Sequence, residues 1–175
     1  MSQEQIKQSI DAAVEYLTKN PQDAAYTDSY ATARLTDLAG LHAAVEGPDG
    51  AQIQTDMPSS VGGTNTYASP GWYLRAAEAS CVATLIAMRA AQLGIRLTEL
   101  EVTVDSESND WGILGIGDGG IPAGPLSTRV TVKVQGEGAA DGNLREIVDW
   151  AVEHCPVTDA VKRAIPMTVE VNAAG

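Results

Sequence analysis

The chain has 175 residues, and 23 acidic against 11 basic side chains give it a formal net charge of −12 at pH 7. This charge argues against a nucleic-acid-binding surface, which needs clustered Lys and Arg, and the apolar runs are too short to cross a membrane. Two cysteines are too few for the disulfide framework of a secreted protein, so they are inert core residues, metal ligands or redox groups. With a polar N-terminus that lacks a signal-peptide core, a cytoplasmic protein is expected.

The first expected element is an amphipathic helix. Residues 3–19 place apolar side chains on one face and Gln, Lys and Glu on the other. Asn20-Pro21 ends this helix. We assign residues 1–24 to an N-terminal helical extension and residues 25–175 to the main domain.

A β-hairpin is expected next. Residues 41–45 and 52–55 lie on either side of Gly47-Pro48-Asp49-Gly50, a sequence typical of a tight turn. Residues 57–69, rich in Gly, Ser and Thr, are expected to form a loop.

A long helix follows, from Ser69 to Gln92. Pro70 suits the first helical turn, and the run after it is rich in Ala, Leu and Met until Gly94. Apolar side chains at three- and four-residue steps share one face: Leu74, Ala77, Cys81, Leu85 and Met88. Cys81 is therefore expected on the apolar stripe of a helix of mostly small residues.

Strands and two further helices complete the chain. Three segments alternate apolar and polar residues, which predicts an antiparallel sheet with one face in the core: Leu100 to Asp105, Val130 to Gln135 and Met167 to Val171. Residues 109–125 are a Gly-rich loop. Helices are expected near residues 141–154, buried along Leu144, Ile147, Val148 and Ala151, and from Pro156 to about Ile165.

Four candidate motifs lack the sequence context that they need. The glycines of residues 115–120 match a dinucleotide-binding pattern, but a Pro-rich segment follows where a helix must begin. Residues 105–116 lack the Gly and Glu of a calcium loop. No pair of Cys or His residues has metal-ligand spacing, and a Ser-His-Asp triad has no Gly-x-Ser-x-Gly elbow to support it. We therefore expect neither a metal nor another cofactor.

Cys155 precedes Pro156, which predicts that Cys155 caps the start of a helix. Free backbone N–H groups and the helix dipole favour a thiolate there and lower the pKa of the thiol. The nearby Glu153 and Asp159 act in the opposite direction. A cysteine that merely packs at a helix junction is the alternative.

Cys81 alone is consistent with an inert core cysteine, since free cysteine is among the most buried residue types. Glu78 lies three residues earlier on the same helical face, where it could orient a guanidinium or a peroxide, or accept a proton. An ordinary surface pair between Arg75 and Glu78 is the alternative.

These motifs together resemble the OsmC/Ohr family, the osmotically inducible and organic hydroperoxide resistance proteins. The resemblance rests on Gly62-Gly63, Pro70, Ser80-Cys81 within a helix and His154-Cys155-Pro156-Val157 at a helix start. It covers roughly residues 28–172 and leaves the N-terminal helix outside.

The resemblance implies an α+β fold in which an antiparallel sheet wraps on long central helices in an intertwined homodimer. It also implies a thiol-dependent peroxidase that reduces organic hydroperoxides under oxidative stress. Cys81 matches the peroxidatic cysteine of the family and Cys155 the resolving cysteine, with a disulfide between them in each turnover. A dithiol, such as a dihydrolipoyl protein, would then reduce the disulfide.

One departure from the family pattern concerns the activation of Cys81. Gly71 stands where the family's peroxidases carry a Glu that binds an Arg from an N-terminal strand. The Arg position falls at residues 41–42, and Arg34 is the nearest arginine. We hypothesise that Glu78 replaces the missing carboxylate, paired with His42 or Arg34.

Two other functions stay open. A family member could keep the fold, lose or change the peroxidase chemistry, and bind a small apolar or electrophilic ligand between subunits. A structural dimer with two inert thiols is the other, and it predicts slow, equal alkylation of both cysteines.

Overall fold

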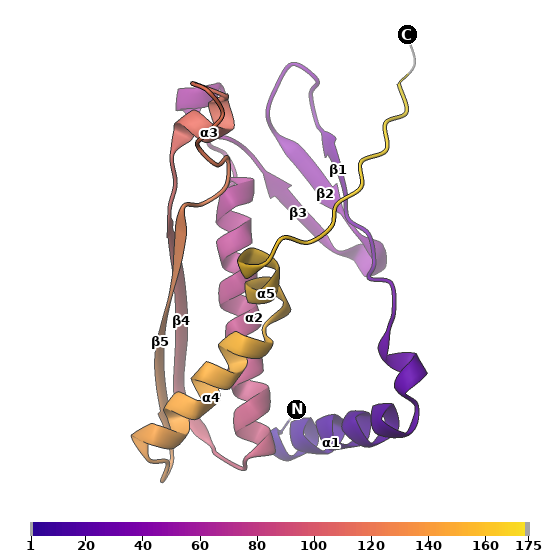
Figure 1. The fold of residues 1–175 in the computed structure, drawn as a ribbon, viewed down its shortest axis with the longest axis vertical. Coiled ribbons are helices and arrows are strands. Elements are labelled where there is room, and N and C mark those ends of the chain that lie inside the picture. Colours follow the sequence, from indigo (N-terminus) through magenta and orange to yellow (C-terminus); the bar gives the residue numbers. More distant parts are fainter. Residues whose placement is uncertain (1, 174–175) are drawn as a thin grey trace.

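The computed structural model describes residues 2–173 and is arranged around one long central helix, α2 (Figure 1). A long two-stranded ribbon runs beside α2, and a small separate sheet lies near its N-terminal end. In chain order the elements are α1 (Gln3–Lys19), β1 (Thr32–Leu35), β2 (Ala43–Glu46), β3 (Gln52–Thr55), α2 (Pro70–Gln92), β4 (Leu97–Glu107), α3 (Asp110–Leu114), β5 (Ser127–Gly136), α4 (Asp141–His154) and α5 (Pro156–Lys162). None of the helices among these residues is both long and apolar enough to span a bilayer.

The helix α2 begins and ends as its sequence predicts. The Ser69 side chain accepts a hydrogen bond from the Trp72 N–H, and Pro70 occupies the first turn. Gly94 follows with φ of +69°, a left-handed conformation that suits glycine after a helix.

The face of α2 that is fully buried differs by one position from the expected stripe. Val82, Ile86 and Ala90 are completely buried, whereas Leu74 is 39% exposed. Each step of one residue along an α-helix turns the side-chain direction by about 100°. The stripe that contains Cys81 therefore lies beside the core rather than in its centre. The helix therefore has a second apolar face that the chain covers only in part.

The core forms where α2 meets α4 and the ribbon. Strands β4 and β5 pair antiparallel, with Val102 opposite Val132, and alternate between half-buried and exposed side chains as predicted. Helix α4 buries Leu144, Ile147 and Ala151, also as predicted. Ile147 and Ala151 belong to one buried cluster with Ile86, and Cys155 is a member of the same cluster.

The hairpin at residues 43–55 is confirmed, but the strands do not form one sheet. Strands β1, β2 and β3 form an antiparallel sheet of their own, and β4 and β5 form a second. The small sheet is tied to α2 by a hydrogen bond from the Tyr73 hydroxyl to the Gln54 carbonyl, 3.0 Å. Figure 1 shows it standing apart from the ribbon.

The prediction of a strand at Met167 to Val171 is wrong for the single chain. Among residues 2–173 this segment pairs with no strand, and Met167, Val169 and Val171 are 85%, 71% and 79% exposed. Two smaller differences concern helices. Helix α5 ends at Lys162 rather than near Ile165, and the Gly-rich loop contains the short helix α3.

Candidate functional site

The fold brings the two cysteines together. Cys81 lies midway along α2, and Cys155 lies at the junction of α4 and α5. Both are free thiols, Cys155 is fully buried, and Cys81 is half-buried beside it. Cys81 packs against the buried cluster that contains Cys155, and each thiol shifts the pKa of the other. Two thiols from distant parts of the sequence thus form one site at the edge of the core.

Cys155 caps α5, as its position before Pro156 predicts. Its sulfur accepts a hydrogen bond from the Thr158 backbone N–H, with N and Sγ 3.4 Å apart. Burial raises the pKa of this thiol, but hydrogen bonds from the Thr158 side chain and backbone, from Cys81 and from the Val157 backbone outweigh burial, and the pKa is lowered. The environment therefore favours the thiolate at Cys155.

Cys81 experiences the opposite effect. Burial raises the pKa of its thiol, and the hydrogen bond with Cys155 raises it further, against a smaller opposing effect of the Val157 backbone. Within one chain Cys155 is thus the more acidic member of the pair, and Cys81 is the more accessible one.

Glu78 is not the surface residue of an Arg75–Glu78 pair. Its side chain is only 2% exposed, and its Oε1 accepts a hydrogen bond from the Thr158 hydroxyl at 3.2 Å. Arg75 instead donates to the Ser106 hydroxyl at 3.2 Å. Thr158 therefore links Glu78 to Cys155, because it contacts the carboxylate through its hydroxyl and the sulfur through its backbone N–H.

The expected pairing of Glu78 with His42 or Arg34 does not occur within the chain. Arg34 forms an exposed ion pair with Glu46 on the neighbouring strand. His42 hydrogen bonds to Thr36 and Gln54 and stacks on Tyr67. Arg34 lies in β1 and His42 directly before β2, and the hydrogen bonds of both are made with partners other than Glu78.

A second buried carboxylate fixes the loop that leads into α2. Asp56 is 1% exposed and accepts hydrogen bonds from the backbone N–H groups of Met57, Thr64 and Thr66, and from the Thr64 hydroxyl at 2.6 Å. These bonds, the one from the Thr64 side chain above all, lower its pKa to about 2. Gly63 closes the same loop, where a Cβ would lie 1.8 Å from the Met57 carbonyl oxygen.

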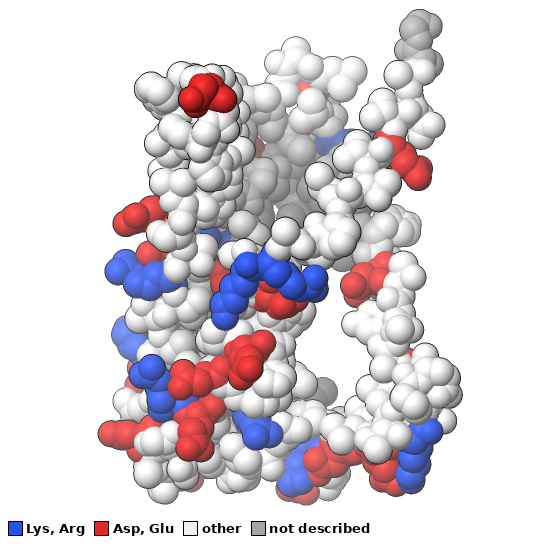
Figure 2. Space-filling model, viewed as in Figure 1, with Lys and Arg blue, Asp and Glu red and all other residues white. Residues whose placement is uncertain are grey.

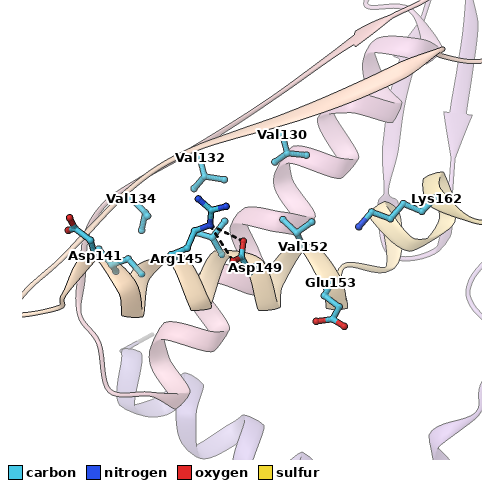
Figure 3. Close-up of a pocket in the computed structure, with 11 residues that line it drawn as sticks. Val130, Val132, Val134, Asp141, Arg145, Asp149, Val152, Glu153 and Lys162 are labelled. Atoms are coloured by element: carbon cyan, nitrogen blue, oxygen red, sulfur yellow. Dashed lines mark hydrogen bonds and ion pairs between the residues drawn. The ribbon is translucent and has the colours of Figure 1, made fainter.

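A groove of about 710 Å³ runs between β5 and α4, away from the thiols. Figure 3 shows Val130, Val132 and Val134 on its strand side and the Arg145–Asp149 ion pair on its helix side. Neither cysteine lines it. Nowhere in residues 2–173 do three or more His, Cys, Asp or Glu side chains gather in a way that could hold a metal ion.

The sequence interpretation missed Thr158 and Asp56. Thr158 is 3% exposed, and its only sequence signal is its place three residues after a helix-capping cysteine. Asp56 stands between a strand and a loop rich in Gly, Ser and Thr, where aspartates commonly bind backbone N–H groups.

Comparisons with known proteins agree with this architecture. An OsmC-like protein of Mycoplasma pneumoniae superposes with a TM-score of 0.64 at 15% identity, covering 79% of this chain and 89% of its own. An organic hydroperoxide resistance protein of Legionella pneumophila gives 0.57 at 21% identity, covering 79% and 91%, and one of Elizabethkingia anophelis gives 0.56 at 18%, covering 79% and 91%. At these identities the likeness shows the fold alone.

No curated protein matches the sequence. The model of the family described as OsmC-like protein matches residues 63–170, which is more than half of the chain and includes both cysteines. Together with the shared α+β fold, this match shows that the chain belongs to the OsmC-like protein family.

Proposed function

We propose that the protein is a thiol-dependent peroxidase that reduces organic hydroperoxides through Cys81 and Cys155. The observation that carries the proposal is the pair of neighbouring free thiols, one half-buried and one fully buried. The names of the Legionella and Elizabethkingia neighbours, both organic hydroperoxide resistance proteins, support the substrate class.

In the proposed reaction Cys81, the more accessible thiol, attacks as the thiolate. Its sulfur bonds to one peroxide oxygen, the O–O bond breaks, and the other oxygen takes a proton and leaves as an alcohol. Cys155 then attacks the resulting sulfenic acid, an S–S bond forms, and water leaves. A dithiol reductant, such as a dihydrolipoyl protein, restores both thiols by exchange. These thiols must be kept reduced between turnovers, which suits a cytoplasmic setting.

The proposal includes an intertwined homodimer. One apolar face of α2 is only partly covered, the small sheet is separate from the β4–β5 ribbon, and the exposed Met167 to Val171 segment pairs with no strand in the described part of the chain. Figure 2 shows an opening between α4 and the segment that joins α1 to β1, which the chain does not fill with its own side chains. A second copy would cover these surfaces and could bring a cation to Cys81.

The test is a thiol count with intact mass on the reduced protein, before and after one equivalent of cumene hydroperoxide. Rapid loss of both thiols with a mass decrease of two hydrogens is the expected result. Cys81→Ser should abolish the reaction. Survival of both thiols, or slow oxidation of Cys81 without a disulfide, would refute the proposal.

A second function is favoured by three features of the site. The pKa of Cys81 is raised in the chain, Gly71 cannot supply a carboxylate, and Arg34 is paired with Glu46. These features suit a family member that binds a small apolar or electrophilic ligand without turnover. Such a protein would bind cumene alcohol and cumene hydroperoxide equally and leave both thiols intact.

A further inference from the structure

The short helix α5 is attached to the rest of the chain by few side chains. Within Pro156–Lys162 only Thr158 is buried, at 3% exposure, and Val157 is partly buried against the core. Residues 161–173 are all exposed. Helix α5 lies against α2 (Figure 1), where the Thr158 hydroxyl donates to the Glu78 carboxyl group with the two oxygens 3.2 Å apart. This buried hydrogen bond is therefore a main attachment of α5.

Glu78 is a costly partner for such an attachment. Its side chain is 2% exposed, and none of the ion pairs among residues 2–173 includes it. Burying a carboxyl group whose partner is a neutral hydroxyl lowers stability. A hydrogen bond is directional, however, so it fixes the relative position of two helices more narrowly than an apolar contact does. The contact therefore suits a role in position rather than in stability.

The same hydrogen bond joins the two helical turns that carry the thiols. Glu78 precedes Cys81 by three residues on α2, and Thr158 follows Cys155 by three residues at the start of α5. Three residues of an α-helix rise about 4.5 Å, so each partner of the hydrogen bond lies about one turn from a cysteine. The Thr158 backbone N–H also donates to the Cys155 sulfur, with N and Sγ 3.4 Å apart. Thr158 thus contacts both α2 and the sulfur of the second thiol.

We propose that the hydrogen bond between Thr158 and Glu78 positions Cys155 for disulfide formation with Cys81. The inference rests on the proposed function and deepens it by naming two residues that act through Cys155. Both are positioning residues, and neither gains or loses a proton in the reaction. The hydrogen bond holds the first turn of α5 on α2, and the Thr158 N–H then holds the sulfur beside Cys81. Without it, Cys155 lies within reach of Cys81 for less of the time.

The step that depends on this position is the closure of the disulfide. The Cys155 thiol first loses its proton to solvent. The Cys155 thiolate then bonds to the sulfur of the proposed sulfenic acid on Cys81, the S–O bond breaks, and the hydroxide leaves as water with a proton from solvent. Because the fold holds both sulfurs, the rate depends on how often they lie in the geometry of attack. A misplacement of about 1 Å can slow such a step about 100-fold.

Two sets of variants separate position from stability. Thr158→Val and Glu78→Met each remove one partner of the hydrogen bond and leave the other buried without it, which lowers stability. The double variant removes both partners, and an apolar pair of similar shape is nearly neutral for stability. Thr158→Ser and Glu78→Gln keep the donor and the acceptor. Thr84→Val is the matched control, because Thr84 is exposed on α2 and its hydroxyl donates to the Ser80 carbonyl.

The readout is the rate of disulfide closure in the full chain after cumene hydroperoxide, followed by intact mass, with urea midpoints measured in parallel. Thr158→Val, Glu78→Met and the double variant should close the disulfide about tenfold or more slowly, and sulfinic acid should accumulate on Cys81. Thr158→Ser, Glu78→Gln and Thr84→Val should close it at nearly the rate of the unmodified sequence. A double variant that closes at the unmodified rate would overturn the inference, and so would a conservative variant slowed as much as its apolar counterpart.

Oxidised glutathione separates this inference from the peroxidase itself. It forms a mixed disulfide with Cys81, the more accessible thiol, and releases one glutathione thiol. Cys155 then bonds to the Cys81 sulfur and displaces the second glutathione. The same order of rates is expected for this closure. If cumene hydroperoxide leaves the unmodified protein unchanged while glutathione closure follows this order, the peroxidase proposal fails and the positioning role stands. Equal closure in all variants, or no disulfide in the unmodified chain with either oxidant, would refute the positioning role.

Discussion

Replacing Glu78 by Gln should make the reduced protein more stable. The Glu78 side chain is 2% exposed and accepts a 3.2 Å hydrogen bond from a hydroxyl. A hydrogen bond to a charged group contributes about 1.5 to 3 kcal/mol, whereas the desolvation of a buried ion costs several kcal/mol. Gln removes the charge and keeps an acceptor, but its amide adds donors that also need partners. The expected net gain in unfolding free energy at pH 7 is about 1 to 2 kcal/mol.

The assay is urea unfolding of the reduced protein, followed by tryptophan fluorescence at several protein concentrations so that association is separated from folding. Glu146→Gln is the matched control, because Glu146 is exposed on α4 and its replacement should change stability by less than about 0.5 kcal/mol. A loss of about 3 to 5 kcal/mol on replacing Glu78 would refute the reasoning, since that is the cost of breaking a buried ion pair. It would mean that a cation, supplied by a second copy of the chain, compensates the carboxylate.

Three further predictions follow from the site and the core. Cys155→Ser should still react with cumene hydroperoxide but accumulate sulfinic acid on Cys81, because no second thiol intercepts the sulfenic acid. Intact mass measures the product. A stable sulfenic acid, or no reaction, would contradict this prediction. Ile147→Ala should cost about 2 to 5 kcal/mol of unfolding free energy by leaving a cavity in the completely buried cluster around Ile86, and a urea midpoint equal to that of the parent chain would contradict this. The lowered pKa of Asp56 contributes stability above the unfolded-state value of 3.8 that is lost as pH falls through about 2, so Asp56→Asn should flatten the thermal stability profile over that range. An unchanged profile would show that Asp56 does not set it.

Local patterns predicted the helices well, because each helix carries its own start signal, apolar period and stop signal. Pro70 and Gly94 bound α2, and the cap at Cys155 could be read from the proline after it. The ribbon of β4 and β5 was equally predictable from strict alternation.

What the sequence could not supply was long-range placement. Met167, Val169 and Val171 alternate like a strand, yet a strand exists only where a neighbour supplies hydrogen bonds, and no local pattern names that neighbour. Likewise Glu78 was expected to pair with His42 or Arg34, or with Arg75 on its own helix, whereas its partner Thr158 comes from a helix that only the folded chain brings near. Contacts of this kind depend on packing rather than on period, so the candidate site was only half predictable.

The position of the thiol pair also means that oxidation of the two cysteines changes the stability of the fold. Cys81 lies in the central helix, and Cys155 lies where the last two helices meet. A disulfide between them would therefore cross-link the middle of the chain to its C-terminal part. In the chain-entropy model a disulfide that closes a loop of this length adds about 4.5 kcal/mol to the unfolding free energy. The oxidised protein would then melt at a higher temperature than the reduced one, and a melting curve alone would follow the redox cycle without any label on sulfur.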